Sequence, residues 1–424
     1  MLNRVLRICL GFLILVVSIP VRADDVEQTV AELRERIEAL EKQQAADSKT
    51  FKLYWKEGIR FDTPDKAFQM RIGGRIQNDW AFFDQDSSLE DAVGNWDDGT
   101  EFRRARLYMQ GLLYEMVELK AEYDFAGGDA DFKDVYLGLK GLPVGRLRVG
   151  HFKEPFSLDE LISNNYMTFL ERALPNALVP ARNTGIMINN HVLEDRMTYA
   201  LGVFREADDF GSGEGDGKYN VTARLTGLPL YEDEGSALLH LGLAYSHRNR
   251  SDTFSYSQRP ESHLAERLIN TGSVEVDDLD LVGAEVAMVY GPASLQVEYI
   301  TAMVDDDAGS NPDFSGYYIQ TSYFLTGEHR PYRLSDAVFS RVKPKADFPG
   351  QEGGIGAWEI AARYSHLDLK DGGINGGELD DVTVGLNWYL NPNTRVMLNY
   401  VYADASDLYE GATHILQTRF QIDF

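Results

Sequence analysis

The sequence HILQTRFQIDF, residues 414–424, alternates between two kinds of side chain at the C-terminal end of the chain. One face of an extended strand would carry Leu416, Thr418, Phe420, Ile422 and Phe424, and the opposite face Gln417, Arg419, Gln421 and Asp423. A strand of about ten residues with this alternation and a terminal aromatic side chain is typical of a membrane-spanning β-barrel. The stretch therefore predicts a strand with one face in lipid and one in water.

The same alternation recurs along most of the chain. It predicts about sixteen strands, near residues 68–83, 101–113, 117–125, 132–141, 145–152, 183–193, 197–205, 219–227, 238–248, 279–290, 293–304, 314–326, 356–367, 379–390, 394–404 and 414–424. Such strands must close into a ring, because an open sheet edge cannot satisfy its hydrogen bonds in lipid. A soluble β protein is the alternative, which a hydrophobic content of 44% does not exclude. Residues 51–424 are expected to form one all-β, antiparallel transmembrane barrel.

The connections between these strands alternate in length. Short ones at 114–116, 142–144, 194–196, 291–292 and 391–393 are expected to be periplasmic turns. Longer, acidic connections are expected to face the outside of the cell. One connection breaks the rule, because residues 327–356 are long and fall on the periplasmic side, and the pattern does not explain their length.

The connection GHFKEPFSLDELISNNYMTFLERALPNALVPARNTG, residues 150–185, is far too long for a hairpin turn. Ser157 and Glu160 fit a helical capping box, and a second helix is predicted from residue 166 to 174, ended by Pro175. Its apolar side chains favour packing over disorder. Residues 153–182 are therefore expected to fold into the barrel and narrow the pore.

The N-terminal region differs in composition from the barrel. Residues 1–23 combine early arginines with a short apolar core, which predicts a secretory signal peptide; a retained membrane anchor is the alternative. Residues 24–50 are predicted to form a periplasmic helix and a polar linker. Apolar residues recur there at coiled-coil spacing, at Val26, Val30, Leu33, Ile37 and Leu40. This seam predicts a coiled coil with helices of partner chains, and a helix docked on its own domain is the alternative.

Composition excludes several functions. The formal net charge is −26, which argues against a nucleic-acid partner. The single cysteine, Cys9, lies in the predicted signal peptide, so no disulfide is expected, and no cofactor or metal site is recognised. The eight histidines are scattered without an evident nucleophile, so no enzyme is expected. The predicted location is the bacterial outer membrane, with its lipids as partners.

Many basic residues fall on the water-facing side of the predicted strands. They are Arg71, Arg75, Arg104, Arg106, Lys120, Arg146, Arg148, Arg224, Arg363 and Arg419. A charge that faces lipid at the midplane costs about 2–4 kcal/mol, so these side chains should face the lumen. Rings of basic side chains select anions in pores. The alternative is that they form salt bridges within the wall with Glu118, Glu122, Asp124, Asp134, Glu285 and Glu298.

Several stretches resemble the phosphate-selective porin O and P family. They include FRRARLYMQG at 102–111, FKDVYLGLKGL at 132–142, and GHFKEPFSLDEL and YMTFLERALPN at 150–161 and 166–176. The resemblance implies a trimer of sixteen-stranded barrels, a constricting third loop and a central anion site. The family's site residues correspond here to Arg103, Arg104, Asp134, Ser163 and Arg172. Asn164 stands where phosphate-specific members have a second serine, and Arg75 and Arg106 complete the candidate site.

Two points stay open at this stage. Alternation alone places Arg103 on the outer face or the rim, so an inward-facing Arg103 and Arg104 pair requires a β-bulge. The favoured function is passive diffusion of anions such as phosphate or polyphosphate, and the alternative is a general or cation-preferring porin. A barrel hydrolase and a sealed structural barrel are hypotheses from other classes.

Overall fold

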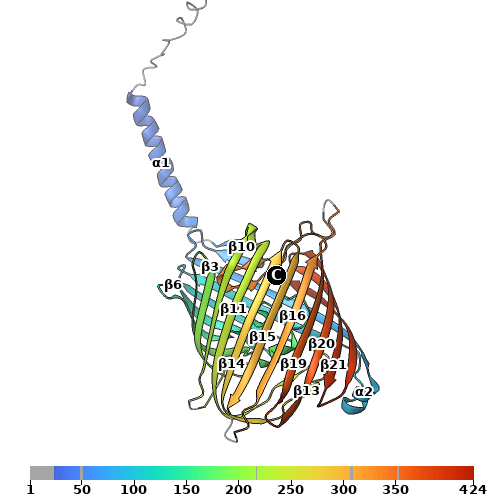
Figure 1. The fold of residues 1–424 in the computed structure, drawn as a ribbon. Helices are drawn as coiled ribbons and strands as arrows, with labels where there is room; N and C mark the ends of the chain where they lie inside the picture. Colours follow the sequence, from blue (N-terminus) through green and yellow to red (C-terminus); the bar gives the residue numbers. More distant parts are fainter. Residues whose placement is uncertain (1–22, 48–50, 216, 306–308, 351–352) are drawn as a thin grey trace, which may run out of the picture. The chain divides into compact units, whose positions relative to one another are not determined.

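The computed structural model describes residues 23–47, 51–215, 217–305, 309–350 and 353–424. Sixteen antiparallel strands form a closed barrel, drawn in Figure 1. They are β3 (Phe68–Gln85), β4 (Gly99–Leu113), β5 (Val117–Asp124), β6 (Asp131–Leu142), β7 (Gly145–Lys153), β8 (Arg182–Val192), β9 (Met197–Arg205), β10 (Asn220–Glu232), β11 (Ala237–Phe254), β14 (Val274–Tyr290), β15 (Ala293–Asp305), β16 (Asp313–Phe324), β19 (Ala357–Asp371), β20 (Ile374–Asn391), β21 (Thr394–Ser406) and β22 (Gly411–Asp423). Each overlaps one predicted strand, so the predicted fold is confirmed.

The last strand closes the barrel against the first. Pairing of β22 with β3 runs from Thr413, opposite Gln85, to Asp423, opposite Arg75. Beyond the paired stretch, Phe424 exchanges two backbone hydrogen bonds with Gly74, at 2.8 and 3.0 Å. The alternation behaves as predicted, since Arg419 is fully buried while Phe420 is 52% exposed on the outer face. The same strand therefore supplies the lipid-facing surface and part of the lumen.

The remaining elements are short or lie outside the barrel. Strands β1 (Lys52–Trp55) and β2 (Ile59–Asp62) form a hairpin whose second strand extends the sheet at β3. Two further hairpins, β12 (Ser257–Gln258) with β13 (Ile269–Asn270) and β17 (Tyr332–Arg333) with β18 (Val338–Phe339), lie within connections. The other helices are α2 (Ser87–Val93), α3 (Leu158–Leu161), η1 (Leu174–Leu178), η2 (Asp233–Gly235) and η3 (Leu334–Asp336).

The N-terminal helix α1 (Ala23–Asp47) belongs to a separate unit. It includes residues 43–47, which the sequence assigned to a linker. The side chains of Val30, Leu33, Ile37 and Leu40 are all exposed, so no described residue within this unit covers the apolar stripe. The predicted signal peptide lies outside the described residues, apart from its last residue. None of the described helices is long and apolar enough to cross a bilayer.

Three connections pack against the inner side of the wall. They are residues 154–181, here called the inner loop; residues 255–273, here called the vestibule loop; and the periplasmic connection between β16 and β19, described at 325–350 and 353–356. Each contributes fully buried apolar side chains, for example Leu158, Ile269 and Phe339. The inner loop and the periplasmic connection share one hydrophobic cluster, in which Ile162 and Phe339 take part. The sequence pattern predicted that the inner loop packs inside the barrel, but it did not predict this for the other two connections.

The inner loop does not form the second predicted helix. Residues 166–173 are irregular, and Pro175 stands at the beginning of η1 rather than at the end of a helix. The prediction was wrong because several backbone carbonyls of this segment accept hydrogen bonds from side chains of the barrel wall instead of from N–H groups of the same segment. Long-range donors have replaced the local ladder that helix propensity assumes.

Candidate functional site

A row of wall side chains holds the inner loop by its backbone carbonyls. Arg395 donates to Met167 at 2.7 Å, Asn387 to Thr168 at 2.8 Å, Arg419 to Leu170 at 2.6 Å and Arg363 to Glu171 at 3.0 Å. The donors come from β19, β20, β21 and β22, which lie side by side in the barrel. Arg363 and Arg419 thus face inward as predicted, but their guanidinium groups anchor the loop.

The other end of the inner loop is held by a carboxylate. Glu298 on β15 accepts hydrogen bonds from the backbone N–H groups of Leu158 and Asp159, at 2.9 and 2.7 Å. The hydroxyl of Tyr318 donates to the same carboxylate at 2.5 Å. Glu298 therefore binds unpaired N–H groups at the start of α3 rather than forming the predicted salt bridge with a wall arginine.

Only half of the predicted capping box is formed. The Ser157 hydroxyl accepts from the backbone N–H of Glu160 at 3.2 Å. The Glu160 carboxylate turns instead to Lys153 and Arg172, at 3.0 and 3.1 Å. Burial by itself would raise the pKa of Glu160, but Arg172 and Lys153 outweigh it and lower the pKa to about 2. The Glu160 carboxylate is therefore ionised in the folded protein near neutral pH.

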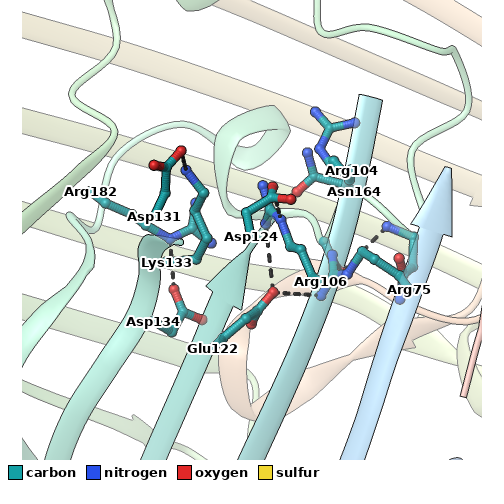
Figure 2. Close-up of polar contacts among 12 residues, drawn as sticks. Arg75, Arg104, Arg106, Glu122, Asp124, Asp131, Lys133, Asp134, Asn164 and Arg182 are labelled. Atoms are coloured by element: carbon teal, nitrogen blue, oxygen red, sulfur yellow. Dashed lines mark hydrogen bonds and ion pairs between the residues drawn. The ribbon is translucent and has the colours of Figure 1, made fainter. Parts of the chain in front are cut away.

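Arg172 and Asp134 each have partners of their own. Arg172 donates to the backbone carbonyls of Asp159, Glu160 and Ile162, at 2.9, 2.9 and 3.1 Å. Asp134 accepts from Lys120 at 2.6 Å. It also accepts from Arg182 at 2.8 Å, as Figure 2 shows. The structure places no contact among Arg104, Asp134 and Arg172 within its described residues. Of the candidate site residues, Asp134 and Arg172 therefore lie in sets of contacts separate from that of Arg104.

A β-bulge brings Arg103 to the inside of the barrel. Gln77 is paired with Arg104 and Asn78 with Phe102, so Arg103 is an extra residue in β4. Its side chain donates from Nε and Nη2 to the two carboxylate oxygens of Glu171 on the inner loop, at 2.9 and 3.0 Å. Burial would raise the pKa of Glu171, but Arg103, Arg104 and Arg419 hold it well below the usual range. Arg103 and Arg104 therefore both reach the inner loop.

Arg104 is buried among neutral partners. Arg104 is only 2% exposed. Its Nη1 donates to the amide oxygen of Gln77 at 2.8 Å. The hydrogen-bond network orients the Asn164 amide so that its oxygen accepts from Nη2 at 2.6 Å and from Nε at 2.9 Å. Figure 2 shows the two side chains together at the inner loop. In the described part of the chain no carboxylate lies within ion-pair distance of this guanidinium.

The neighbouring arginines on β3 and β4 are paired with carboxylates. Arg75 contacts Glu122 at 2.9 Å, and Arg106 contacts Asp124 at 2.6 Å (Figure 2). Arg75 Nη1 also lies 3.5 Å from the Ser163 hydroxyl of the inner loop. Two buried donors here, Arg75 Nε and Arg106 Nη1, have no hydrogen-bond acceptor among the described residues. The salt bridges predicted for Glu122 and Asp124 are therefore present, and two arginine N–H groups beside them lack a hydrogen-bond acceptor among the described residues.

Several cavities border the inner loop in the described part of the chain, and two of them have the most charged linings. The larger, about 490 Å³, is lined from the wall, from inner-loop residues Pro155 and Leu161, and from Arg333 and Asp336 of the periplasmic connection. The smaller, about 260 Å³, is lined by Glu171, Arg172, Asn176 and Ala177 of the inner loop, by Arg103 of β4, and by residues 258–263 and 267 of the vestibule loop. The inner loop therefore borders one cavity that includes residues of the periplasmic connection and one that includes residues of the vestibule loop.

The vestibule loop is a part of the site that sequence reasoning missed. Glu261 is 2% exposed and accepts from Arg363 at 2.9 Å, from Thr383 at 2.5 Å and from Ser365. This anchor brings Arg259 and Arg267 to the smaller cavity. The only signal in the sequence was a short apolar run at 268–269 inside a polar connection. The partners of Glu261 lie more than 100 residues away.

The periplasmic connection was also unexplained by the sequence. Tyr332 reaches Nδ1 of His240 at 2.7 Å, and Arg330 lies over the Phe339 ring at 3.9 Å and donates to Gln296 at 2.9 Å. Arg341 donates to the Tyr166 hydroxyl of the inner loop at 3.1 Å. The connection thus contacts both the barrel wall and the inner loop.

Comparisons with known proteins identify the family to which this chain belongs. The family model for phosphate-selective porin O and P matches residues 70–424. Porin O of Pseudomonas aeruginosa is 29% identical over 390 residues, covering 82% of this chain and 86% of that protein. An uncharacterized protein of Caulobacter vibrioides is 31% identical over 371 residues, covering 85% of this chain and 72% of the other.

Solved structures support the same fold. The anion-selective porin from Comamonas acidovorans has a TM-score of 0.54 at 15% identity, covering 84% of this chain and all of that one. The outer membrane channel DcaP of Acinetobacter baumannii has a TM-score of 0.53 at 11% identity, covering 85% and 99%. The sixteen-stranded barrel, the family match over nearly all of it and these neighbours lead to one conclusion: the chain is a bacterial outer-membrane porin that belongs to the phosphate-selective porin O and P family.

Proposed function

We propose that this porin lets anions such as phosphate or polyphosphate diffuse passively across the outer membrane. We further propose that the selective site is at the inner loop and centres on Arg104, with Arg75, Arg103, Arg106, Ser163 and Asn164 around it. Passive transport rather than catalysis fits the family membership. In this proposal Asp134 and Arg172 do not bind the anion directly. Asp134 holds basic side chains of the wall, and Arg172 holds the backbone of the inner loop.

The charges that line the two cavities favour anions. Nine basic and three acidic residues line the larger cavity, and four arginines and two glutamates line the smaller one. This balance contrasts with the net charge of −26 for the whole chain. Because low-dielectric walls focus the field of their charges, a basic lining raises the local concentration of anions. The acidic surplus is carried by other parts of the molecule.

The observation that carries the proposal is the setting of Arg104. A buried cation without a carboxylate partner is costly, and a mobile anion would remove that cost. A guanidinium fork suits phosphate because it offers two parallel donors. Arg75 Nε and Arg106 Nη1, which have no hydrogen-bond acceptor among the described residues, are further donors for an anion on the same two strands. Asn164 would have to move for the ion to take its place on Arg104.

The alternative is a general or cation-preferring porin. It is favoured by Glu122, Asp124, Asp134 and Glu171, which neutralise most of the arginines and lysines around the inner loop. The reversal potential in a potassium chloride gradient across a planar bilayer separates the two functions. A potential of the anionic sign, together with block of the chloride current by phosphate, is the expected result. A cationic sign without phosphate block would reject the proposal.

We also propose that the porin is a homotrimer whose copies associate in part through α1, after removal of the signal peptide. The exposed apolar stripe from Val30 to Leu40 supports this. A short helix is only marginally stable alone, and burying this stripe against the same helix of other copies would stabilise it. Deletion of residues 25–46 should weaken the trimer slightly, as measured by cross-linking in detergent, and leave conductance unchanged. Loss of the pore itself would contradict an accessory role for the helix.

A further inference from the structure

One polar arrangement recurs on the outer face of the barrel. On β11, Tyr245 and His247 are followed across the sheet by Asp280 of β14; on β19, Tyr364 and His366 are followed by Asp380 of β20. In both sets the histidine lies directly opposite the aspartate in the strand register. The recurrence is visible in the sequence as Tyr-Ser-His at 245–247 and again at 364–366.

The two sets share their hydrogen bonds. Asp280 accepts from the Tyr245 hydroxyl at 2.7 Å and lies 2.9 Å from Nδ1 of His247. Asp380 accepts from the Tyr364 hydroxyl at 2.6 Å and lies 2.9 Å from Nδ1 of His366. Because the carboxylate engages Nδ1, each imidazole directs Nε2 away from it. For His366, no partner of Nε2 is found within the described ranges.

A related pair lies on the next hairpin of the wall. The Tyr400 hydroxyl of β21 lies 2.7 Å from Nδ1 of His414 on β22, and the ring of Tyr402 lies 5.2 Å from the same imidazole. Tyr317 of β16 likewise packs on His366, with 5.3 Å between ring centroids. The three groups together, called here the Tyr–His–Asp belt, combine aromatic faces with hydrogen-bonding side chains.

The belt faces outward. Tyr245, Tyr317, Tyr400 and Tyr402 are 36–45% exposed, whereas the intervening Ser246 and Ser365 are fully buried on the lumen side. Such polar groups are costly at the centre of the bilayer but cost little at its surface. Their position in the membrane therefore decides what they contact.

The three histidines lie at one height. His247 is ten residues from the start of β11 at Ala237, and His366 is nine residues from the start of β19 at Ala357. His414 is nine residues from the end of β22 at Asp423. With a rise of about 3.3 Å per residue and a tilt of about 40°, this is about 25 Å above the periplasmic end. The apolar band of such barrels is about 25 Å tall, so the belt lies at the outer surface of the membrane.

We infer that the Tyr–His–Asp belt binds the saccharide headgroup of a glycolipid in the outer leaflet. Sugar rings present an apolar face that packs on aromatic side chains and hydroxyls that pair with carboxylates and imidazoles. Asp278 lies 3.8 Å from Nε2 of His247 and adds a further negative charge. The belt is acidic on balance, so it suits the hydroxyls of a sugar better than a phosphate group alone. The occupant is thus a phosphorylated or plain glycolipid recognised through its sugar.

The test is native mass spectrometry of the full chain in detergent, titrated with lipid A. The double variant His247→Leu, His366→Leu should bind lipid A about tenfold more weakly, since two hydrogen-bonded partners are lost. The matched control is His191→Leu, because His191 contacts Asp195 in the same way but lies at a periplasmic turn. The control should bind lipid A as the natural protein does. Equal binding by the double variant, or equal loss in the control, would overturn the inference.

Two further arms identify the recognised part of the lipid. Lipid A without its phosphates should bind the natural protein as tightly, and phosphatidylglycerol should not distinguish the natural protein from the double variant. Loss of binding on removal of the phosphates would reject recognition through the sugar. Unchanged conductance of the double variant shows that its barrel is intact, and the milder variant Asp280→Asn, Asp380→Asn repeats the measurement if the first does not fold.

Discussion

The amide oxygen of Asn164 occupies the guanidinium fork of Arg104, accepting from Nη2 at 2.6 Å and from Nε at 2.9 Å. One residue belongs to the inner loop and the other to the wall strand β4. This is the bidentate geometry in which an arginine binds a carboxylate or a phosphate. A neutral side chain of the protein thus stands where the proposed ion would bind, and an incoming anion competes with it.

Substitutions of Asn164 should change the anion site in opposite directions. Asn164→Asp places a carboxylate in the fork, and a charge-assisted pair should weaken phosphate block of the chloride current at least about tenfold. Asn164→Ser is too short to fill the fork, so phosphate should bind several-fold more tightly. Single-channel recording with added phosphate measures both effects. Equal block in the two variants would show that Asn164 does not compete with the ion.

Replacement of Arg104 should reduce selectivity without harming the fold. Arg104→Gln removes a buried charge that has no carboxylate partner, so no orphan charge is left behind. The reversal potential in a salt gradient should move toward the cationic sign, and phosphate block should weaken roughly tenfold. Arg196→Gln, at a periplasmic turn, is the matched control and should leave both quantities unchanged. Unaltered selectivity in Arg104→Gln would leave the proposed site without support.

The periplasmic connection should stiffen the constriction. Phe339 is 1% exposed in the cluster that contains Leu158, Ile162 and Met167 of the inner loop. Phe339→Ala should destabilise the barrel by about 3–5 kcal/mol through loss of burial and cavity formation. Single-channel currents should become larger and noisier, because the inner loop loses the side chain that packs against it from the periplasmic connection. Phe348→Ala changes an exposed ring in the same connection and should have little effect. Quiet currents in Phe339→Ala would contradict the supporting role.

The vestibule loop should restrict the outer mouth through Glu261. Glu261→Gln weakens the contacts to Arg363, Thr383 and Ser365 and should release the loop from the wall. We expect a higher conductance and faster cleavage of residues 255–273 by protease added to intact cells. Glu266→Gln, a change at an exposed position of the same loop, should behave as the natural protein does. A conductance unchanged by Glu261→Gln would mean that the anchor does not limit the pore.

The inner loop should tolerate mild acid. The pKa of Glu160 is lowered to about 2 and that of Glu171 lies well below its usual value, so both contribute stability above the unfolded-state pKa of about 4.5. This contribution is lost only as the pH falls through the lowered values. Protonation of these two carboxylates should therefore not change ion selectivity until the pH falls below about 4. The stability advantage over Glu160→Gln should shrink between about pH 4.5 and 2 in thermal unfolding; a constant advantage would refute this assignment.

The amino-acid sequence by itself determined the barrel. All sixteen strands could be predicted because the period-two alternation is a local property, and lipid on one side and water on the other enforce it along each strand. The inward parity of Arg104, Arg106 and Arg419 follows from the same rule. The inner loop could be expected inside because Tyr166, Phe169 and Leu170 are poorly suited to an exposed connection.

Only the tertiary structure decided which charges are paired. Arg419 meets Asp79 across 340 residues, and Glu261 meets Arg363 across 102, so no local spacing reveals either pair. The bulge at Arg103 depends on the register between β3 and β4, and one extra residue reverses the face that alternation assigns. Arginines of equal parity thus differ in role: Arg363 and Arg419 hold the inner loop, whereas Arg104 keeps its charge unpaired. That difference arises from contacts between distant strands and loops, which form only when the barrel closes.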